Sequence, residues 1–84
     1  MDRFTYNTRG VCSRSIDVSL EDGVILEVVY HGGCSGNTQG VAALVKGMRV
    51  TDAIERLSGI RCGFKNTSCP DQLANALREY LEKN

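Results

Sequence analysis

Apolar residues recur at every second position in parts of the first third of the chain, a period typical of β-strands. The clearest case is residues 16–20, where Ile16, Val18 and Leu20 alternate with polar side chains. An earlier run over residues 4–8 alternates more weakly. A later run over residues 24–30 is apolar on both faces except at Glu27, and this is typical of a strand in the centre of a sheet. The pattern therefore predicts three strands, with the third in the centre.

A tight turn is predicted between the second and third strands. Asp22-Gly23 separates the two runs, and both residues tolerate the positive φ angles that a two-residue hairpin requires. With these residues at the centre of the turn, a constant register places Cys12 opposite Gly33, one residue before Cys34. Cross-strand neighbours lie about 4.5–5.5 Å apart at Cβ, so the hairpin is expected to bring the two cysteines together.

The period changes to that of an α-helix after Gly36. One apolar stripe follows the helical spacing i, i+3, i+4 and i+7, and Gly47 is expected to help end this helix. The stripe consists of Val41, Leu44, Val45 and Met48. Thr51 is expected to cap a short second helix, which Ser58-Gly59 ends.

A third helix is predicted from Cys69-Pro70 onward, with Cys69 as its cap, because proline suits the first helical position and Asp71 suits the first turn. Its inward-facing stripe is Leu73, Ala76, Leu77, Tyr80 and Leu81. A brief extended piece over residues 60–64, carrying Cys62, precedes it. Strands followed by helices predict an α+β fold: a small antiparallel three-stranded sheet with helices packed on one face.

Composition limits the function classes. Eighty-four residues predict a single domain over 1–84, and such a small core gains from an additional cross-link. Ten basic and ten acidic residues cancel, so direct nucleic-acid binding is not expected. No apolar run approaches a membrane span and no leader-like segment follows Met1, so a cytoplasmic location is expected.

The candidate chemistry lies in four cysteines, Cys12, Cys34, Cys62 and Cys69. Thiols stay reduced in the cytoplasm, so a shared metal is favoured over disulfides. Four thiolates suit tetrahedral Zn²⁺, and they also hold iron–sulfur clusters. A thiol–disulfide redox protein using Cys62 and Cys69 is the alternative from the enzyme class. His31 either replaces one thiolate, or donates a hydrogen bond to a metal ligand, or, more simply, is a solvent-facing turn histidine.

Residues 67–71 read Thr-Ser-Cys-Pro-Asp, the signature of the TSCPD domain family. Residues 33–37 and 59–63 also resemble the small stand-alone four-cysteine members of that family, so the resemblance covers nearly the whole chain. It implies a relation to the C-terminal domain of ribonucleotide reductases and a metal-binding accessory role in ribonucleoside-diphosphate reduction, and thus in DNA synthesis. Ribonucleotide reductase is the implied partner. Complete reductase activity needs a large barrel that 84 residues cannot hold.

A more distant resemblance is to NifU/IscU-type iron–sulfur scaffold proteins, which use three cysteines in an order similar to Cys12, Cys34 and Cys69. It implies a NifU/IscU-like fold and the function of an iron–sulfur carrier or scaffold. The sequence departs from the scaffolds in four respects. Ser13-Arg14 follows Cys12 without the acidic residue that the scaffolds place near that cysteine, and the Leu-Pro-Pro-containing segment before the last cysteine is missing. Ser68 stands in place of histidine, and Cys62 is extra. A fourth thiolate closes the coordination sphere that a labile assembly site keeps open.

Overall fold

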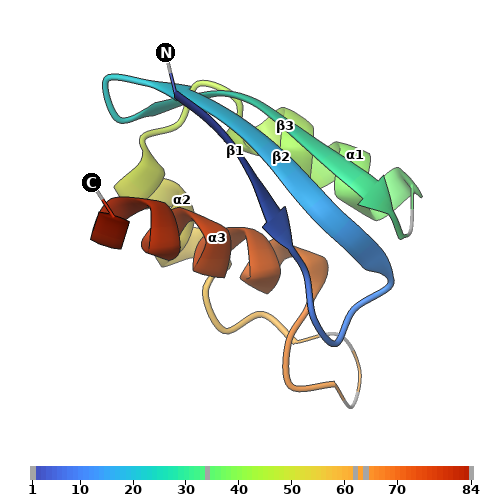
Figure 1. The fold of residues 1–84 in the computed structure, drawn as a ribbon. Helices are drawn as coiled ribbons and strands as arrows, with labels where there is room; N and C mark the ends of the chain where they lie inside the picture. Colours follow the sequence, from blue (N-terminus) through green and yellow to red (C-terminus); the bar gives the residue numbers. More distant parts are fainter. Residues whose placement is uncertain (1, 34, 62, 64, 84) are drawn as a thin grey trace.

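A three-stranded sheet followed by three helices makes up the protein, as the α+β prediction required (Figure 1). The computed structural model describes residues 2–33, 35–61, 63 and 65–83. The elements are β1 (Asp2–Asn7), β2 (Ser13–Glu21), β3 (Val24–Gly32), α1 (Ser35–Val45), α2 (Val50–Leu57) and α3 (Cys69–Lys83).

The sheet is antiparallel in the order β1-β2-β3, so β2 is the central strand. The prediction that the third strand runs centrally is therefore wrong. The segment between α1 and α2 lies along the outer edge of β3: the Ile25 N–H donates to the Met48 carbonyl at 2.9 Å, and the Val50 N–H donates to the Gly23 carbonyl at 2.9 Å. These bonds give the backbone at the outer edge of β3 hydrogen-bond partners, while Val29 on the outer face stays 41% exposed.

The predicted hairpin turn is confirmed, with positive φ at Asp22 (52°) and Gly23 (76°). A constant register is wrong, because two β-bulges interrupt it. Leu26 is the extra residue on β3 in the first bulge, and Arg14 is the extra residue on β2 in the second. The second bulge reverses the shift of the first, so Ser13 pairs with Gly32 as the constant register required.

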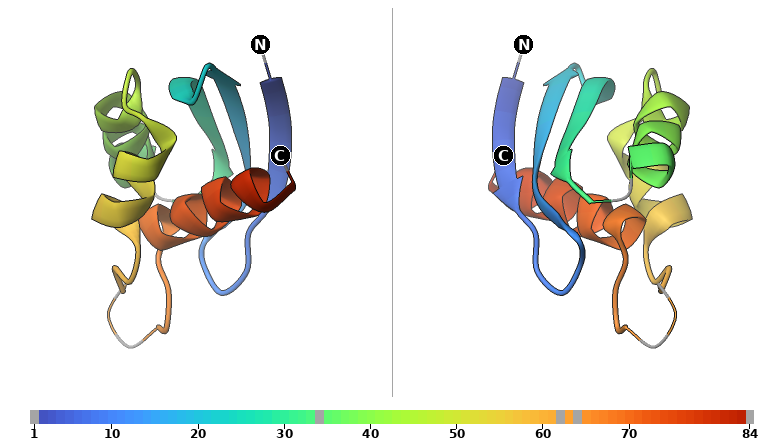
Figure 2. Two further views of the ribbon diagram at one scale, coloured as in Figure 1. Left: turned by 90° about the vertical axis from the view of Figure 1, so that its left-hand side faces the viewer. Right: turned by 90° about the vertical axis from the view of Figure 1, so that its right-hand side faces the viewer.

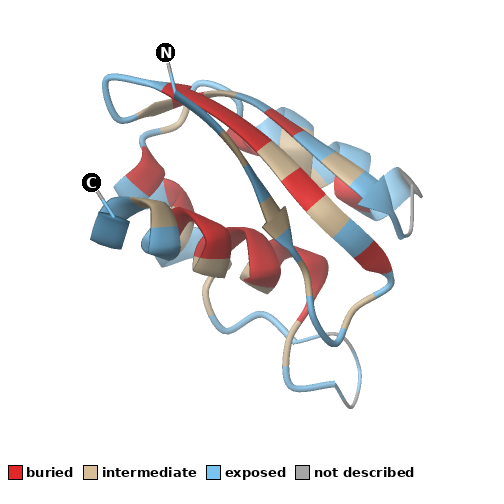
Figure 3. Cartoon of the chain, viewed as in Figure 1, coloured by how far each residue is buried: buried red, intermediate tan, exposed pale blue. Residues whose placement is uncertain are grey.

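All three helices contribute to a core on one face of the sheet. Ile16, Val18 and Leu20 of β2 are fully buried there, and Leu73 and Leu77 of α3 pack against them. α3 crosses this face of the sheet, α1 lies along β3, and α2 packs against α3 (Figure 2). Buried positions follow the inner face of β2 and the facing side of α3 (Figure 3).

Two members of the predicted apolar stripes are exposed. Leu44 is 78% exposed, because α1 meets the core with the side that carries Val41, Ala42 and Val45. Leu81 is 42% exposed. Its neighbour Tyr80 faces β1, and one further residue of helix turns the side chain by about 100° toward solvent.

Thr51 is not the cap of the second helix. Arg49 occupies that position without a side-chain cap bond, and α2 begins at Val50. The bond from the Val50 N–H to the hairpin turn supplies a partner for one of the first helical donors, so the β3 edge rather than a side-chain cap sets where the helix begins. None of the helices in the described ranges is long and apolar enough to cross a membrane.

Candidate metal centre

Two of the four cysteines fall within the described residues, at one end of the molecule. Cys12 is exposed in the loop between β1 and β2, and Cys69 is the first residue of α3 and only 8% exposed. Both are free thiols. The 8–12 loop and the loop that leads into α3 project from the same end in both views of Figure 2. Cys34 and Cys62 lie outside the described residues.

Ser13 connects the two described cysteines. It directly follows Cys12 and is 3% exposed, and its Oγ lies 3.3 Å from the Cys69 Sγ. The start of β2 and the start of α3, 56 residues apart in sequence, are thus in direct contact beside both thiols. This contact brings the segment carrying Cys12 onto the segment carrying Cys69.

The neighbours of the other two cysteines approach the same place. Gly33 precedes Cys34, and a Cβ built on it would lie 3.0 Å from the Ser13 backbone nitrogen, so only glycine, here at φ 87°, permits this approach. Lys65 follows Cys62 by three residues, and its Nζ lies 3.9 Å from the Cys12 Sγ. Gly33 and Lys65 therefore lie close to Ser13 and Cys12, respectively.

The Thr-Ser-Cys-Pro-Asp signature is a helix cap that also fixes a loop. The Ser68 carbonyl accepts the first helical bond, from the Gln72 N–H at 2.8 Å, and the Ser68 Oγ accepts from the Asp71 N–H at 3.2 Å. Ser68, rather than Cys69, is therefore the N-cap of α3. The Ser68 hydroxyl also donates to the Ile60 carbonyl at 2.6 Å, which holds the beginning of the 60–68 loop against the helix.

Asp71 adds two further bonds to this cap. Its Oδ1 accepts from the Gly59 N–H at 2.7 Å, and its Oδ2 accepts from the Thr67 hydroxyl at 2.5 Å. The carboxylate thus holds both ends of the loop that carries Cys62, and its negative charge lies at the positive end of the helix dipole. The expected extended piece over 60–64 lies partly outside the described residues; Gly63 is in a turn.

The loop between β1 and β2 is attached to the same helix start. The Arg9 N–H donates to the Gln72 Oε1 at 3.0 Å, and the Gln72 side-chain amide donates to Thr67 at 3.0 Å. Tyr30 approaches from β3, and its hydroxyl donates to the Cys69 carbonyl at 3.0 Å. Burial, with a smaller contribution from charge on Cys69, raises the pKa of Tyr30 well above its usual value, so this hydroxyl stays a donor.

The described part of this arrangement combines a buried sulfur, an exposed sulfur beside a lysine, and glycine-permitted close packing of the neighbouring segments. Among the described residues no three His, Cys, Asp or Glu side chains form a group that could hold a metal ion, and that search includes only Cys12 and Cys69 of the cysteines. Sequence reasoning missed Ser13, Tyr30 and Gln72, which lie around Cys69.

His31 lies apart from the start of α3. It belongs to β3 rather than to a turn, and its Nε2 lies 2.8 Å from the Asp17 Oδ2 on the outer face of the sheet. Its side chain is 47% exposed. Of the two readings of this residue, the solvent-facing one fits its exposure and partner.

Acid should weaken the contribution of Asp17 to stability. Hydrogen bonds from Thr5 and then from His31 hold the pKa of Asp17 below its ordinary 3.8, so the folded protein favours the ionised form. The stabilisation is present above the unfolded pKa and is lost as the pH falls through the folded pKa. We expect the difference in Tm between the wild type and Asp17→Asn to shrink between about pH 5 and pH 2. Thermal unfolding across that range measures it, with Asp22→Asn as the exposed control; a constant difference contradicts the expectation.

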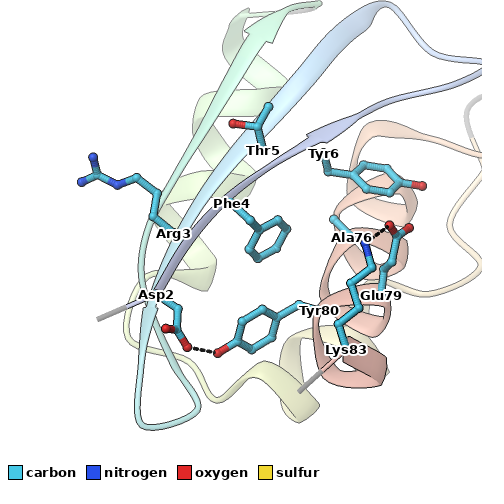
Figure 4. Close-up of a pocket in the computed structure, with 9 residues that line it drawn as sticks. All are labelled: Asp2, Arg3, Phe4, Thr5, Tyr6, Ala76, Glu79, Tyr80 and Lys83. Carbon is cyan, nitrogen blue, oxygen red and sulfur yellow. Dashed lines mark hydrogen bonds and ion pairs between the residues drawn. The ribbon is translucent and has the colours of Figure 1, made fainter.

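A groove lies at the far end of α3. It has a volume of about 390 Å³ and lies between β1 and the last turns of the helix (Figure 4). The rings of Phe4 and Tyr80 stack with their centroids 5.4 Å apart, and the Tyr80 hydroxyl donates to Asp2 at 2.5 Å. This hydrogen bond is the main cause of the raised pKa of Tyr80. Lys83 pairs with Glu79 within α3. The Phe4–Tyr80 stack and the bond from Tyr80 to Asp2 fasten β1 to that helix.

Comparison with known proteins identifies one family. The family model of the TSCPD domain matches residues 2–81. No curated protein and no solved structure matches the chain, so the resemblance to NifU/IscU-type scaffolds gains no support from these comparisons.

Proposed function

Because this chain belongs to the TSCPD domain family, we propose that it is a small metal-binding module that holds one Zn²⁺ through Cys12, Cys34, Cys62 and Cys69. The zinc would act as an internal cross-link. A core in a chain of this size supplies about 3–5 kcal/mol of net stability. A structural zinc site adds about 10–16 kcal/mol of apparent binding free energy in small peptides.

One observation carries the proposal. Ser13 follows Cys12, its Oγ lies 3.3 Å from the Cys69 Sγ, and Gly33, next to Cys34, packs against its backbone. Three cysteine-bearing segments therefore meet at one residue, and Lys65 extends the fourth toward Cys12. The donor set also fits: the two described thiols are free, and all-sulfur sites are typical of structural zinc.

The proposed role is an accessory to ribonucleoside-diphosphate reduction, with ribonucleotide reductase as the partner. It rests on the relation of TSCPD domains to the C-terminal domain of those reductases. The proposal assigns binding rather than catalysis to these 84 residues. Mixing the zinc-loaded protein with the reductase and measuring co-sedimentation tests this part, and separate sedimentation contradicts it.

Metal analysis of protein purified without oxygen tests the site itself. We expect about one zinc per chain, no visible absorption, and thiols that react with a titrant only after the metal is removed. Colourless, metal-free protein with four reactive thiols would contradict the proposal and favour a thiol–disulfide protein that uses Cys62 and Cys69. Brown protein containing iron and sulfide would instead favour an iron–sulfur carrier or scaffold.

A further inference from the structure

Ser13 is a buried residue whose hydroxyl contacts the sulfur of Cys69, a candidate metal ligand, without being a candidate ligand itself. We propose that Ser13 is a positioning residue of the metal site, whose hydroxyl donates a hydrogen bond to the Cys69 sulfur and so strengthens metal retention. The inference rests on the proposed function, because it concerns the same site.

The surroundings of Ser13 fix its position. Its carbonyl accepts from the Thr8 hydroxyl at 2.5 Å, and its backbone pairs with Gly32. Gly33 packs on its other side, where the Cβ of any other residue would come within 3.0–3.2 Å of Ser13 atoms. Ser13 is 3% exposed, so water competes little for the hydroxyl, whose oxygen lies 3.3 Å from the Cys69 Sγ. These contacts keep the Ser13 hydroxyl next to the Cys69 sulfur.

The direction of the bond follows from the charge on the sulfur. In the free thiol either atom can donate, but a metal-bound thiolate has no proton, so the serine must then donate to the sulfur. Hydrogen bonds to an ionised acceptor are stronger than neutral ones, so the contact gains strength when the metal binds. Residues that orient metal ligands in this way typically change metal affinity by about 10–100-fold when they are replaced.

The second bulge is the reason that a serine lies here. Counting by twos from Ile16 along β2 places Ser13 on the outer face with Ser15 and Asp17. Arg14 is the extra residue of the bulge, and it turns Ser13 inward instead. Ser15 remains on the outer face opposite His31, so the strand provides a matched serine control two positions away.

The experiment compares Ser13→Ala with Ser15→Ala in the full chain, using zinc and using Co²⁺ as its spectroscopic substitute. Competition with a chromophoric chelator at constant pH should show about 10–100-fold weaker zinc retention for Ser13→Ala and no change for Ser15→Ala. The sulfur-to-cobalt charge-transfer bands should move to longer wavelength in Ser13→Ala alone, because a thiolate that loses a hydrogen bond gives up electron density more readily.

The outcomes separate the two proposals. Wild-type protein that binds neither zinc nor cobalt overturns both. Wild-type protein that binds them, with chelator competition and cobalt spectra equal in the two variants, overturns only the role of Ser13. Weaker retention accompanied by an unshifted cobalt spectrum and an equal loss of stability in chelator-treated protein also overturns it, since a packing role alone gives that combination.

Discussion

Replacing Cys69 by serine in the metal-loaded protein should release the metal and lower Tm by more than about 20 °C, on the scale of 4–8 °C per kcal/mol for a domain of this size. The sulfur is buried at the start of α3 and contacts the start of β2, so its loss opens the proposed site where the sheet meets the helix. A structural zinc contributes about 10–16 kcal/mol in small peptides, which exceeds what the core alone supplies. Thermal unfolding with metal analysis of the same samples measures both effects.

Ala74→Ser is the matched control for this variant. It places a hydroxyl at a fully buried position of the same helix but leaves all four cysteines in place. We expect it to keep the metal and to lose only the modest stability that a buried hydroxyl costs. Cys69→Ser with an unchanged melting curve and full metal content would show that Cys69 is a small buried side chain rather than a ligand.

Replacing Asp71 by alanine should destabilise the protein by about 2–4 kcal/mol, because two hydrogen bonds to a carboxylate are lost together. The bonds come from the Gly59 N–H and the Thr67 hydroxyl, the two ends of the loop that carries Cys62. We therefore expect a fall in Tm of about 10–25 °C and weaker metal retention, measured by thermal unfolding and by chelator competition.

Two further variants show whether the effect of Asp71→Ala comes from the loop or from the helix dipole. Asp71→Asn keeps the shape and one acceptor oxygen, so it should lose part of the stability that Asp71→Ala loses. Asp52→Ala removes an exposed acidic residue from the first turn of α2 and should change Tm by only a few degrees. If Asp71→Ala lost no more than Asp52→Ala, the carboxylate would serve only the helix dipole and would not hold the loop.

Much of the fold follows from local patterns. The alternation around Ile16 predicts which face of β2 is buried, and Asp22-Gly23 predicts the hairpin turn, because each pattern depends on residues close in sequence. The positions of Leu44, of Thr51 and of β3 within the sheet were predicted wrongly. The start of α2 and the place of β3 depend on the bonds that join residues 47–50 to residues 23–25, which no local period contains. The exposure of Leu44 depends on which side of α1 meets the core.

For the candidate site, the sequence supplied the types of residue and the structure supplied their surroundings. The four cysteines were chosen by residue type and compartment, and their role as ligands stays a prediction. The sequence pattern is misleading for Ser13, because strict alternation from Ile16 places this residue on the outer face of β2. Only the bulge at Arg14 reverses that phase, and no residue type marks the bulge.

By itself, the sequence determined the strands, the hairpin turn, the start of the last helix and the family, because short-range backbone preferences and a five-residue signature are local properties. The tertiary structure decided that the start of β2 lies against the start of α3, that Ser68 and Asp71 hold the 59–68 loop, and that His31 faces Asp17 instead of the cysteines. Those contacts join residues 8–56 positions apart, and closure of the chain around the core brings them together.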